Sequence, residues 1–248
     1  MKNKSVSKAY IRRNSIISFL VFIVLIFGGI YFFKKLKAEN KENGTPTTLR
    51  KTLDFNEKIA NKVFSPDKKT RVFDKSEAAQ NVRVNGYVGI ETAPDRENYF
   101  INVIKNNGDT LKVSVDELKK LPKTDVTFNF KCIEGWSQIT NWSGVKFTDF
   151  IKKYHLENEN SLNYVGMSTP DKKYYVGIDH KSMIQPQTIL AYEMNGKPLP
   201  ANQGYPIRLI IPVKYGVKHL KRIGNIYFSN ERPKDYWYER GYDYYCGF

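Results

Sequence analysis

Residues Phe128 to Gly144, FNFKCIEGWSQITNWSG, place one of the chain's two cysteines between a short apolar strand and a loop that holds two tryptophans. The alternating FNFK run predicts the strand, because every second side chain of a strand points to the same face. A cysteine in this position can be a core residue, half of a disulfide bond, a nucleophile or a metal ligand. The function of the chain depends on which of these Cys132 is.

The remaining chemistry-bearing residues leave these alternatives open. Cys246 lies near the end of the chain in YYCGF, and two cysteines are too few for a disulfide framework and lack the CxxC spacing of a zinc site. In an oxidising compartment a Cys132–Cys246 bridge remains possible, as does a Cys132–His nucleophile pair. The three histidines form no HExxH or HxH pattern, and the sequence has no GxSxG. A histidine-ligated zinc and an α/β-hydrolase are therefore not predicted.

The chain of 248 residues is strongly basic, with 40 Lys and Arg against 25 Asp and Glu and a net charge of +15. Such an excess suits nucleic acid, an anionic membrane or wall, or an anionic ligand. The basic residues are scattered through both halves, with no dense stripe and no nucleic-acid-binding motif. We therefore predict no nucleic-acid partner and a solvated cationic surface.

Residues 16–33, IISFLVFIVLIFGGIYFF, contain no charged side chain. As a helix this segment rises about 27 Å, close to the hydrocarbon thickness of a bilayer. Residues 1–15 carry basic but no acidic side chains, which predicts a cytoplasmic tail and an extracytoplasmic remainder. A cleaved signal peptide is the alternative, but YFFKKLKAEN is a poor cleavage site. We expect a single-pass anchor in the cell membrane.

Beyond the anchor, residues 34–81 predict a tether and an unassigned segment with a helical hint at LDFNEKIANKVF. The SVDELKKL run predicts a short helix capped by Ser114, with Glu117 three residues on, and KFTDFIKKYHL predicts a second helix. Strands are predicted by the runs VRVNGYVG, YFINVIKNNGDTLKVSV, VTFNFKC, LNYVGMS, KKYYVGI, ILAYEMNG, YPIRLIIPV and IGNIYFSN. Strands outnumber helices without alternating with them, so residues 82–248 are expected to form one α+β domain of mixed β-sheets with short helices.

A basic cluster begins in the apolar run YPIRLIIP and continues beyond it. Arg208 lies in YPIRLIIP, and lysines surround Gly216 in PVKYGVKHLKRIG. These groups can lower the pKa of a nearby thiol or hold a phosphate through charge-assisted hydrogen bonds. In a chain this basic, an ordinary surface loop is the other interpretation.

Three blocks in this order, CIEGWSQITNWSG, LAYEMNGKPLP and QGYPIRLIIPVKYGVKHLKRI, resemble the molybdopterin-binding domain of the sulfite oxidase superfamily over about residues 82–248. The resemblance is closest to the periplasmic protein-methionine-sulfoxide reductase catalytic subunits. It implies a mononuclear molybdenum held by molybdopterin, with Cys132 as the protein thiolate ligand. It also implies cofactor contacts at Thr169, Gln203, Arg208, His219, Leu220 and Lys221.

Some positions depart from the family pattern. Gln203 stands where the family has an asparagine, and His219 replaces a glycine. The family also has a segment rich in asparagine and aromatic residues before its first matched strand. Residues 51–81 offer no counterpart to that segment, so its contacts stay unassigned.

The residues after Cys132 bear on the reaction that the resemblance implies. Sulfite oxidases follow the ligand cysteine with a Gly-Asn-Arg-Arg type run, which attracts an anionic substrate, whereas this chain has Glu134 and Trp136 there. An acid and an indole lining the pocket would repel sulfite and suit a neutral sulfoxide. The resemblance therefore implies reduction of a sulfoxide, of the protein methionine sulfoxide type, by oxygen-atom transfer. The chain has no haem motif and no cysteine set for an iron–sulfur cluster, so a membrane haem or quinone-linked protein is expected to supply electrons.

Two alternatives remain. One is a sulfite oxidase-like enzyme acting on a small oxyanion. The other is a cofactor-free module that kept the fold to bind wall or lipid anions, which the charge of +15 favours. The resemblance further implies that the cofactor is inserted in the cytoplasm and the domain exported folded, a route for which Arg12-Arg13 supplies a twin-arginine pair.

Overall fold

The computed structural model describes residues 7–67, 69–95 and 98–248. The chain divides between Thr52 and Leu53 into two compact units. This boundary falls inside helix α2 (Thr47–Val63), which the sequence only hinted at. The predicted domain start at residue 82 stays a prediction.

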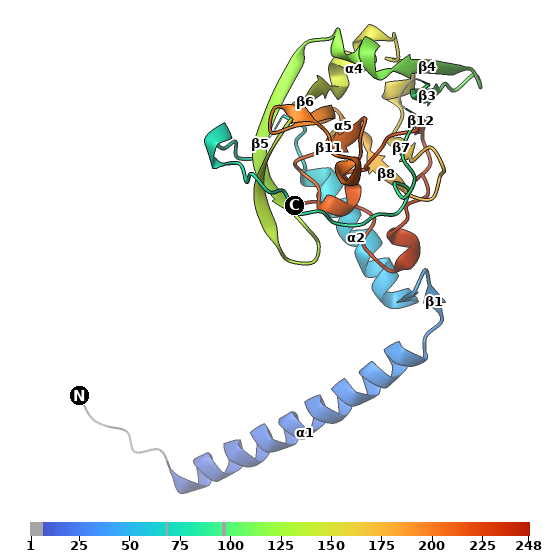
Figure 1. Ribbon diagram of the computed structural model, residues 1–248. Helices are drawn as coiled ribbons and strands as arrows, with labels where there is room; N and C mark the ends of the chain where they lie inside the picture. Colours follow the sequence, from blue (N-terminus) through green and yellow to red (C-terminus); the bar gives the residue numbers. More distant parts are fainter. Residues whose placement is uncertain (1–6, 68, 96–97) are drawn as a thin grey trace. The chain divides into compact units, whose positions relative to one another are not determined.

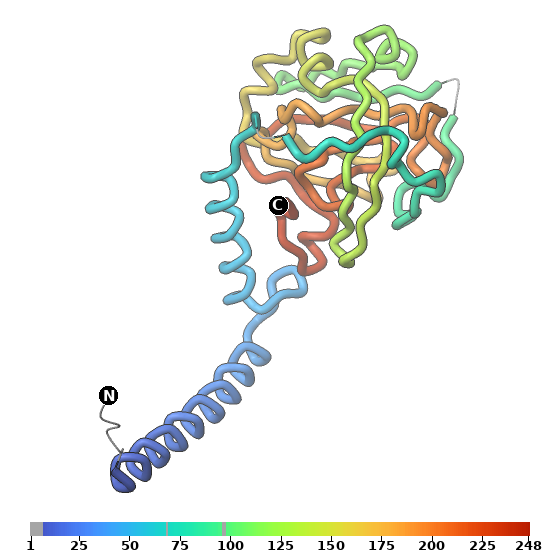
Figure 2. The backbone as a smooth tube through the Cα atoms, turned by 90° about the vertical axis from the view of Figure 1, so that its left-hand side faces the viewer, coloured from blue at the N-terminus to red at the C-terminus, as the bar shows by residue number. Residues whose placement is uncertain are grey.

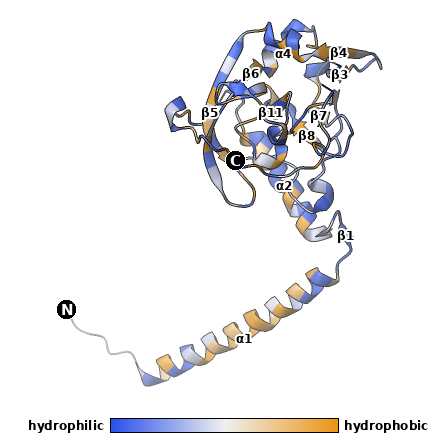
Figure 3. Cartoon of the chain, viewed as in Figure 1, coloured by the Kyte–Doolittle hydropathy of each residue, from blue (hydrophilic) through white to orange (hydrophobic). Residues whose placement is uncertain are grey.

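The first unit is dominated by one long apolar helix, α1 (Lys8–Ala38), drawn largely in orange in Figure 3. Ser7 caps it by accepting a hydrogen bond from the Tyr10 backbone N–H at 3.3 Å. The helix is long and apolar enough to cross a membrane, and it contains the predicted span 16–33. Residues 1–6 of the predicted tail lie outside the described residues. A small hairpin of β1 (Lys41–Glu42) and β2 (Thr45–Pro46) occupies the predicted tether.

The second unit holds two sheets, and the first is antiparallel throughout (Figure 1). Its two longest strands form a hairpin whose halves run side by side in Figure 2. The strand order is β10-β9-β6-β5, and a further strand pairs with β9. The strands of this sheet are β5 (Lys123–Lys131), β6 (Ser137–Lys146), β9 (Ile189–Met194), β10 (Lys197–Pro198) and β11 (Arg208–Ile210).

The second sheet is mixed, with the order β4-β3-β12-β7-β8. The pair of β12 and β3 is parallel and the other pairs are antiparallel. This confirms the predicted α+β class. Its strands are β3 (Phe100–Ile104), β4 (Thr110–Ser114), β7 (Tyr164–Ser168), β8 (Tyr175–Asp179) and β12 (Asn225–Ser229).

Short helices connect the strands. The predicted capping box is present at the first of them, because the Ser114 side chain accepts from the Glu117 N–H at 3.2 Å and the Glu117 carboxylate accepts from the Ser114 N–H at 2.8 Å. The α-helices are α3 (Val115–Lys119), α4 (Phe147–Lys153) and α5 (His180–Met183). The 3₁₀ turns are η1 (Lys75–Glu77), η2 (Glu159–Ser161), η3 (Ala201–Gln203), η4 (Gly216–Lys218) and η5 (Tyr238–Arg240).

Two hydrophobic clusters hold the second unit together, and burial of this apolar surface is the main stabilising term. The larger cluster draws on both sheets and includes Ile101, Phe147, Val165, Ile178, Leu190, Leu209 and Ile226. The smaller cluster lies against the β5–β6 hairpin and includes Val126, Phe128, Phe130, Trp142, Ile189 and Ile210.

The structure corrects two sequence predictions. VRVNGYVG forms a loop instead of a strand, because Gly86 and Gly89 adopt left-handed backbone angles (φ +66° and +78°) that interrupt an extended run. The predicted loop with two tryptophans ends earlier than expected, so that Trp142 lies inside β6. It is buried there, and its indole N–H donates to the Thr140 hydroxyl at 2.8 Å.

Gly144 sits at a register shift between β6 and β9, where the two backbones approach closely. A Cβ atom at this position would lie 2.1 Å from the Leu190 carbonyl oxygen. We expect Gly144→Ala to lower the free energy of unfolding by about 3 kcal/mol, as overpacking does in a core. Urea unfolding of the purified chain checks this. The matched control is Gly28→Ala, because nothing lies within 4 Å of that position, and an equal loss in both variants would contradict the prediction.

Candidate functional site

Cys132 lies in the tight reversal that joins β5 to β6. Its N–H donates to the Trp136 carbonyl at 2.9 Å, and its own carbonyl accepts from the Gly135 N–H at 3.1 Å. Gly135 allows this closure because its φ is +92°, in the left-handed region. The turn thus fixes the thiol, which is only 5% exposed, at the end of a rigid hairpin.

The thiol lines a cavity of about 300 Å³, within the range of small-molecule sites. Five segments far apart in the sequence meet there: the loop after residue 82, the Cys132 turn, Tyr174 just before β8, the segment from η4 to Lys221, and the residues around η5. The lining residues are Asn85, Gly86, Val88, Cys132, Ile133, Glu134, Tyr174, Gly216, Val217, His219, Lys221, Trp237 and Tyr242.

The surroundings of Cys132 oppose the loss of its thiol proton. Burial raises the pKa of the thiol, and the Glu134 charge raises it further. Hydrogen bonds from the Glu134 backbone and the Asn85 side chain act in the opposite direction. A metal ion supplies the positive charge that converts such a thiol into a thiolate. The donor set at Cys132 therefore fits a metal ligand.

Arg208 is a buried cation close to this cavity. Its Nη1 donates to the Gln203 carbonyl at 3.1 Å and to the Gln203 side-chain oxygen at 2.9 Å, and its Nη2 donates to the His219 carbonyl at 3.3 Å. Its Nε has no hydrogen-bond partner within the described chain. Burial lowers the Arg208 pKa to about 9. All of its acceptors are neutral.

Lys221 is a second cation at this site and is partly buried. Its Nζ donates to three carbonyl oxygens, those of Asn85 at 2.6 Å, Gly86 at 2.9 Å and Asn202 at 2.9 Å. Desolvation, together with the nearby Arg208 charge, lowers its pKa to about 7. Across residues 7–67, 69–95 and 98–248, neither cation forms an ion pair with a carboxylate. Because buried charges are normally paired, this arrangement fits a bound anion such as a phosphate group.

The other lysines of the basic cluster have a different role. Lys214 pairs with Asp179 at 2.6 Å, and Lys218 pairs with Asp235 at 2.5 Å and donates to the Gly177 carbonyl at 2.9 Å. Both lysines are buried, so the surface-loop interpretation is wrong for them. They hold the segment in place.

His219 separates the cavity from the apolar cluster of the hairpin. Its ring stacks on Phe128 with centroids 5.9 Å apart and meets Phe130 at 4.7 Å. Burial lowers its pKa to about 3, so the ring is neutral near pH 7. Its Nδ1 accepts from the Ile211 N–H at 3.4 Å, which leaves Nε2–H to donate to the Lys214 carbonyl at 3.1 Å.

Not every predicted site residue reaches the cavity. Glu134 lines it, but Trp136 does not. The Trp136 ring stacks on Phe130 at 5.9 Å and lies under the Arg83 guanidinium, and its indole N–H donates to the Glu134 carboxylate at 3.3 Å. The structure thus gives Trp136 a positioning contact with Glu134.

The predicted residues Thr169, Gln203 and Leu220 do not line the cavity. Thr169 is buried beneath Gly89, and its hydroxyl donates to Asp171 at 2.6 Å. Gln203 is buried and donates to the Val82 and Arg83 carbonyls at 3.3 Å each. Leu220 belongs to the larger hydrophobic cluster, so only its backbone is available to a ligand.

Sequence reasoning missed the loop around Asn85 and the aromatic residues near η5. The Asn-Gly pair at Asn85 is a turn signal, and it could have argued against a strand there. Trp237 and Tyr242 also line the cavity, although they follow Cys132 by more than 100 residues. A local sequence pattern cannot predict contacts between residues so far apart in the chain.

Comparison with known proteins shows a family match and similar relatives. The oxidoreductase molybdopterin-binding domain matches residues 88–237. A protein from Azospira oryzae, provisionally named a protein-methionine-sulfoxide reductase subunit, is 32% identical over 195 residues, 78% of this chain and 73% of that protein. The protein-methionine-sulfoxide reductase catalytic subunit of Campylobacter jejuni is 30% identical over 159 residues, 57% of this chain and 52% of that protein.

More distant proteins share the fold. Rat mitochondrial sulfite oxidase is 27% identical over 175 residues, 60% of this chain and 32% of that protein. The sulfane dehydrogenase SoxCD of Paracoccus pantotrophus superposes with a TM-score of 0.50 at 15% identity, covering 57% of this chain and 40% of the other. The chain spans about half of the Campylobacter protein and a third of the rat enzyme.

The Lys221 pKa gives a pH dependence that can be measured. Between about pH 7 and the ordinary lysine value of 10.5, the unfolded chain binds more protons at this position than the folded chain. The free energy of unfolding therefore rises with pH in that window, and the cost of burying the charged ammonium is fully present below about pH 7. We expect Lys221→Gln to flatten this rise in urea unfolding of the cofactor-free chain.

The control for this series is Lys112→Gln, which removes an exposed lysine on β4. This variant should show the same slope of unfolding free energy against pH as the wild-type chain. A Lys221→Gln chain with the wild-type slope would show that Lys221 stays charged in the folded state.

Proposed function

The chain belongs to the family of oxidoreductases with a molybdopterin-binding domain, and on this premise we propose that it is a molybdenum-dependent reductase of sulfoxides, of the protein methionine sulfoxide type. Its cofactor is molybdopterin with a single molybdenum. The names of the Azospira and Campylobacter relatives support this reaction. The observation that carries it is the buried Cys132 thiol beside Glu134 and aromatic walls in one cavity.

The residues present fit this cofactor. Cys132 would bind the metal through Sγ, while Arg208 and Lys221 would place positive charge at the pterin phosphate. The backbone groups of His219, Leu220 and Lys221 would also contact the pterin phosphate. When bound, the group supplies two-electron oxygen-atom-transfer chemistry, and the protein positions it and shapes the access.

The chain's own side chains favour a neutral substrate. Glu134 places a carboxylate beside Cys132, which repels an anion such as sulfite. Lys221 is the cationic side chain among the described lining residues, and a bound pterin phosphate would balance its charge. His219 is neutral. These features favour a sulfoxide over the small oxyanion of a sulfite oxidase.

The walls beside Cys132 also suit the carbon substituents of a sulfoxide. Val88, Ile133, Tyr174, Trp237 and Tyr242 line the cavity with apolar and aromatic surface. Sulfur groups make favourable contacts with aromatic ring edges. These side chains would hold the substrate's alkyl groups and exclude water around the reacting sulfur.

The setting that we propose is a single-pass anchor with the catalytic domain outside the cytoplasm. Helix α1 has the length and composition for this role, and Arg12-Arg13 before its apolar part suits export of a folded, cofactor-loaded domain. Two relatives are named as subunits, which supports a partner that supplies electrons. We propose that this partner is a membrane haem or quinone-linked protein.

The function is tested with the full chain purified from cells that make molybdopterin. We expect close to one molybdenum per chain, and reduction of methionine sulfoxide by an artificial electron donor well above any oxidation of sulfite. Cys132→Ser should abolish turnover and release molybdenum. Sulfite oxidation as the dominant activity would contradict the proposed reaction, and a folded wild-type chain without molybdenum would favour the cofactor-free binding module.

Lys221 and Lys218 predict different losses. Lys221→Gln removes a charge offered to the phosphate, so we expect at least a tenfold lower molybdenum content, since about 1.4 kcal/mol of lost binding is a factor of ten. The cofactor-free variant should lose no stability. Lys218→Gln leaves Asp235 buried without its partner, so it should lower stability by about 3 kcal/mol. Molybdenum per folded chain and urea unfolding measure the two effects. Similar molybdenum loss in both variants would contradict this division of roles.

A further inference from the structure

Helix α2 presents apolar side chains to solvent and charged side chains to the protein. Phe55, Ile59 and Val63 follow one another at intervals of one turn and are 61%, 47% and 75% exposed. On the other side of the helix, carboxylates at Asp54 and Glu57 pair with Arg232. A helix that packs its apolar stripe on a core shows the reverse arrangement. The exposed stripe would therefore be stabilised by contact with an apolar partner outside the fold.

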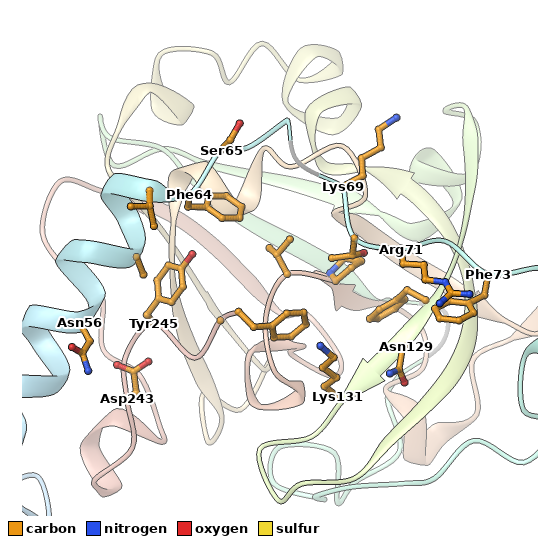
Figure 4. A pocket seen from close by; sticks show the side chains of 18 residues that line it. Asn56, Phe64, Ser65, Lys69, Arg71, Phe73, Asn129, Lys131, Asp243 and Tyr245 are labelled. Carbon is orange, nitrogen blue, oxygen red and sulfur yellow. The ribbon is translucent and has the colours of Figure 1, made fainter. Parts of the chain in front are cut away.

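The stripe continues into a second and larger hollow, of about 830 Å³ (Figure 4). Val63 belongs to both features. The hollow lies between α2, residues 64–65 and 69–73, β5 and the last residues of the chain. Its apolar lining includes Ala60, Val63, Phe64, Phe73, Phe128, Val213, Tyr245 and Phe248.

Cationic side chains border this hollow. Lys69 extends outward in Figure 4, the Arg71 guanidinium lies 4.7 Å from the Phe73 ring centroid, and the Lys131 Nζ lies 3.8 Å from that of Phe248. These three form no ion pair within the described residues. Asp243 is the acid among the described lining residues. Apolar surface with a cationic border is the pattern of a protein face at an anionic bilayer surface.

The connection between α1 and α2 is short, which keeps α2 near the membrane in which α1 is proposed to lie. Helix α1 ends at Ala38 and α2 begins at Thr47, so eight residues, 39–46, join them. Fully extended, they span at most about 30 Å. With α1 in a membrane, as proposed above, the start of α2 stays within that reach of the lipid surface.

We infer that the α2 stripe (Phe55, Ile59 and Val63) and the adjoining hollow form a docking face for the anionic surface of the membrane that holds α1. The stripe enters the boundary between headgroups and acyl chains, and Lys69, Arg71 and Lys131 meet the lipid phosphates. The inference rests on the proposed membrane anchor. Docking would limit the rotation of the catalytic unit on its tether.

The test measures depth in the bilayer with the full chain reconstituted in vesicles of phosphatidylcholine and phosphatidylglycerol, with or without brominated acyl chains. Ile59→Trp adds an indole to the stripe, and Ile104→Trp adds a matched indole at the end of β3, where the isoleucine is 38% exposed. Wild-type emission is subtracted to remove the native tryptophans. Bromolipid should quench the indole added by Ile59→Trp at least about twofold, because interfacial helices sink roughly 5–10 Å into the boundary. The indole added by Ile104→Trp should be unaffected.

A second measurement tests the charges. Lys69→Glu with Arg71→Glu should reduce quenching at position 59, whereas Lys105→Glu with Lys112→Glu, on the β3–β4 hairpin, should not. Equal quenching at positions 59 and 104 would overturn the docking face. So would shielding at position 59 that appears only with a partner protein or at high protein concentration, because the occupant would then be a protein.

Membrane retention separates this inference from the anchor. If the wild-type chain resists carbonate extraction but position 59 is not quenched, the docking face is wrong and the anchor stands. If carbonate removes the chain, both are wrong, while molybdenum content and sulfoxide reduction still report on the reaction.

Discussion

A buried positive charge without a carboxylate partner is the constraint on which the site depends. Arg208 is buried behind the lining residue His219, and the partly buried Lys221 lines the cavity. The donors of both reach only carbonyl and amide oxygens. Neutral dipoles solvate a cation less well than water does, and burial lowers the pKa of both groups accordingly. A phosphate would restore the balance of charge, and its binding energy would then contribute directly to the stability of the folded chain. Cofactor loading and folding are thereby coupled.

The same segment also contains lysines whose charge is fully balanced. Lys214 and Lys218 pair with Asp179 and Asp235, and the last residues of the sequence cover them. The Lys218 Nζ lies 4.4 Å from the Tyr244 ring centroid, and a β-bridge joins Lys214 to Gly247. These contacts make the segment rigid before it reaches His219. One stretch of basic sequence thus supplies both a fixed support and a charge that has no carboxylate partner among the described residues.

Local patterns were sufficient for much of the fold. Alternation predicted strands β3 to β5 and β7 to β9, and the Ser114–Glu117 spacing predicted a cap that the structure confirms. Side-chain alternation failed to predict the loop around Gly86 and Gly89, because the left-handed backbone angles of these glycines interrupt the strand. The place of Cys132 near basic residues could be anticipated from sequence order. Which lysines are paired could not, because their carboxylate partners lie 17 and 35 residues away.

The Cys246 thiol lines neither the catalytic cavity nor the larger hollow, whereas the Cys132 thiol lines the cavity. Cys246 is buried, its Sγ lies 2.8 Å from the Asp243 carbonyl oxygen, and desolvation raises its pKa to about 12. Both cysteines are free in the described residues. Since peroxides and electrophiles attack the thiolate form, Cys246 should be slow to form a sulfenic acid or to take up an alkylating reagent in the folded chain.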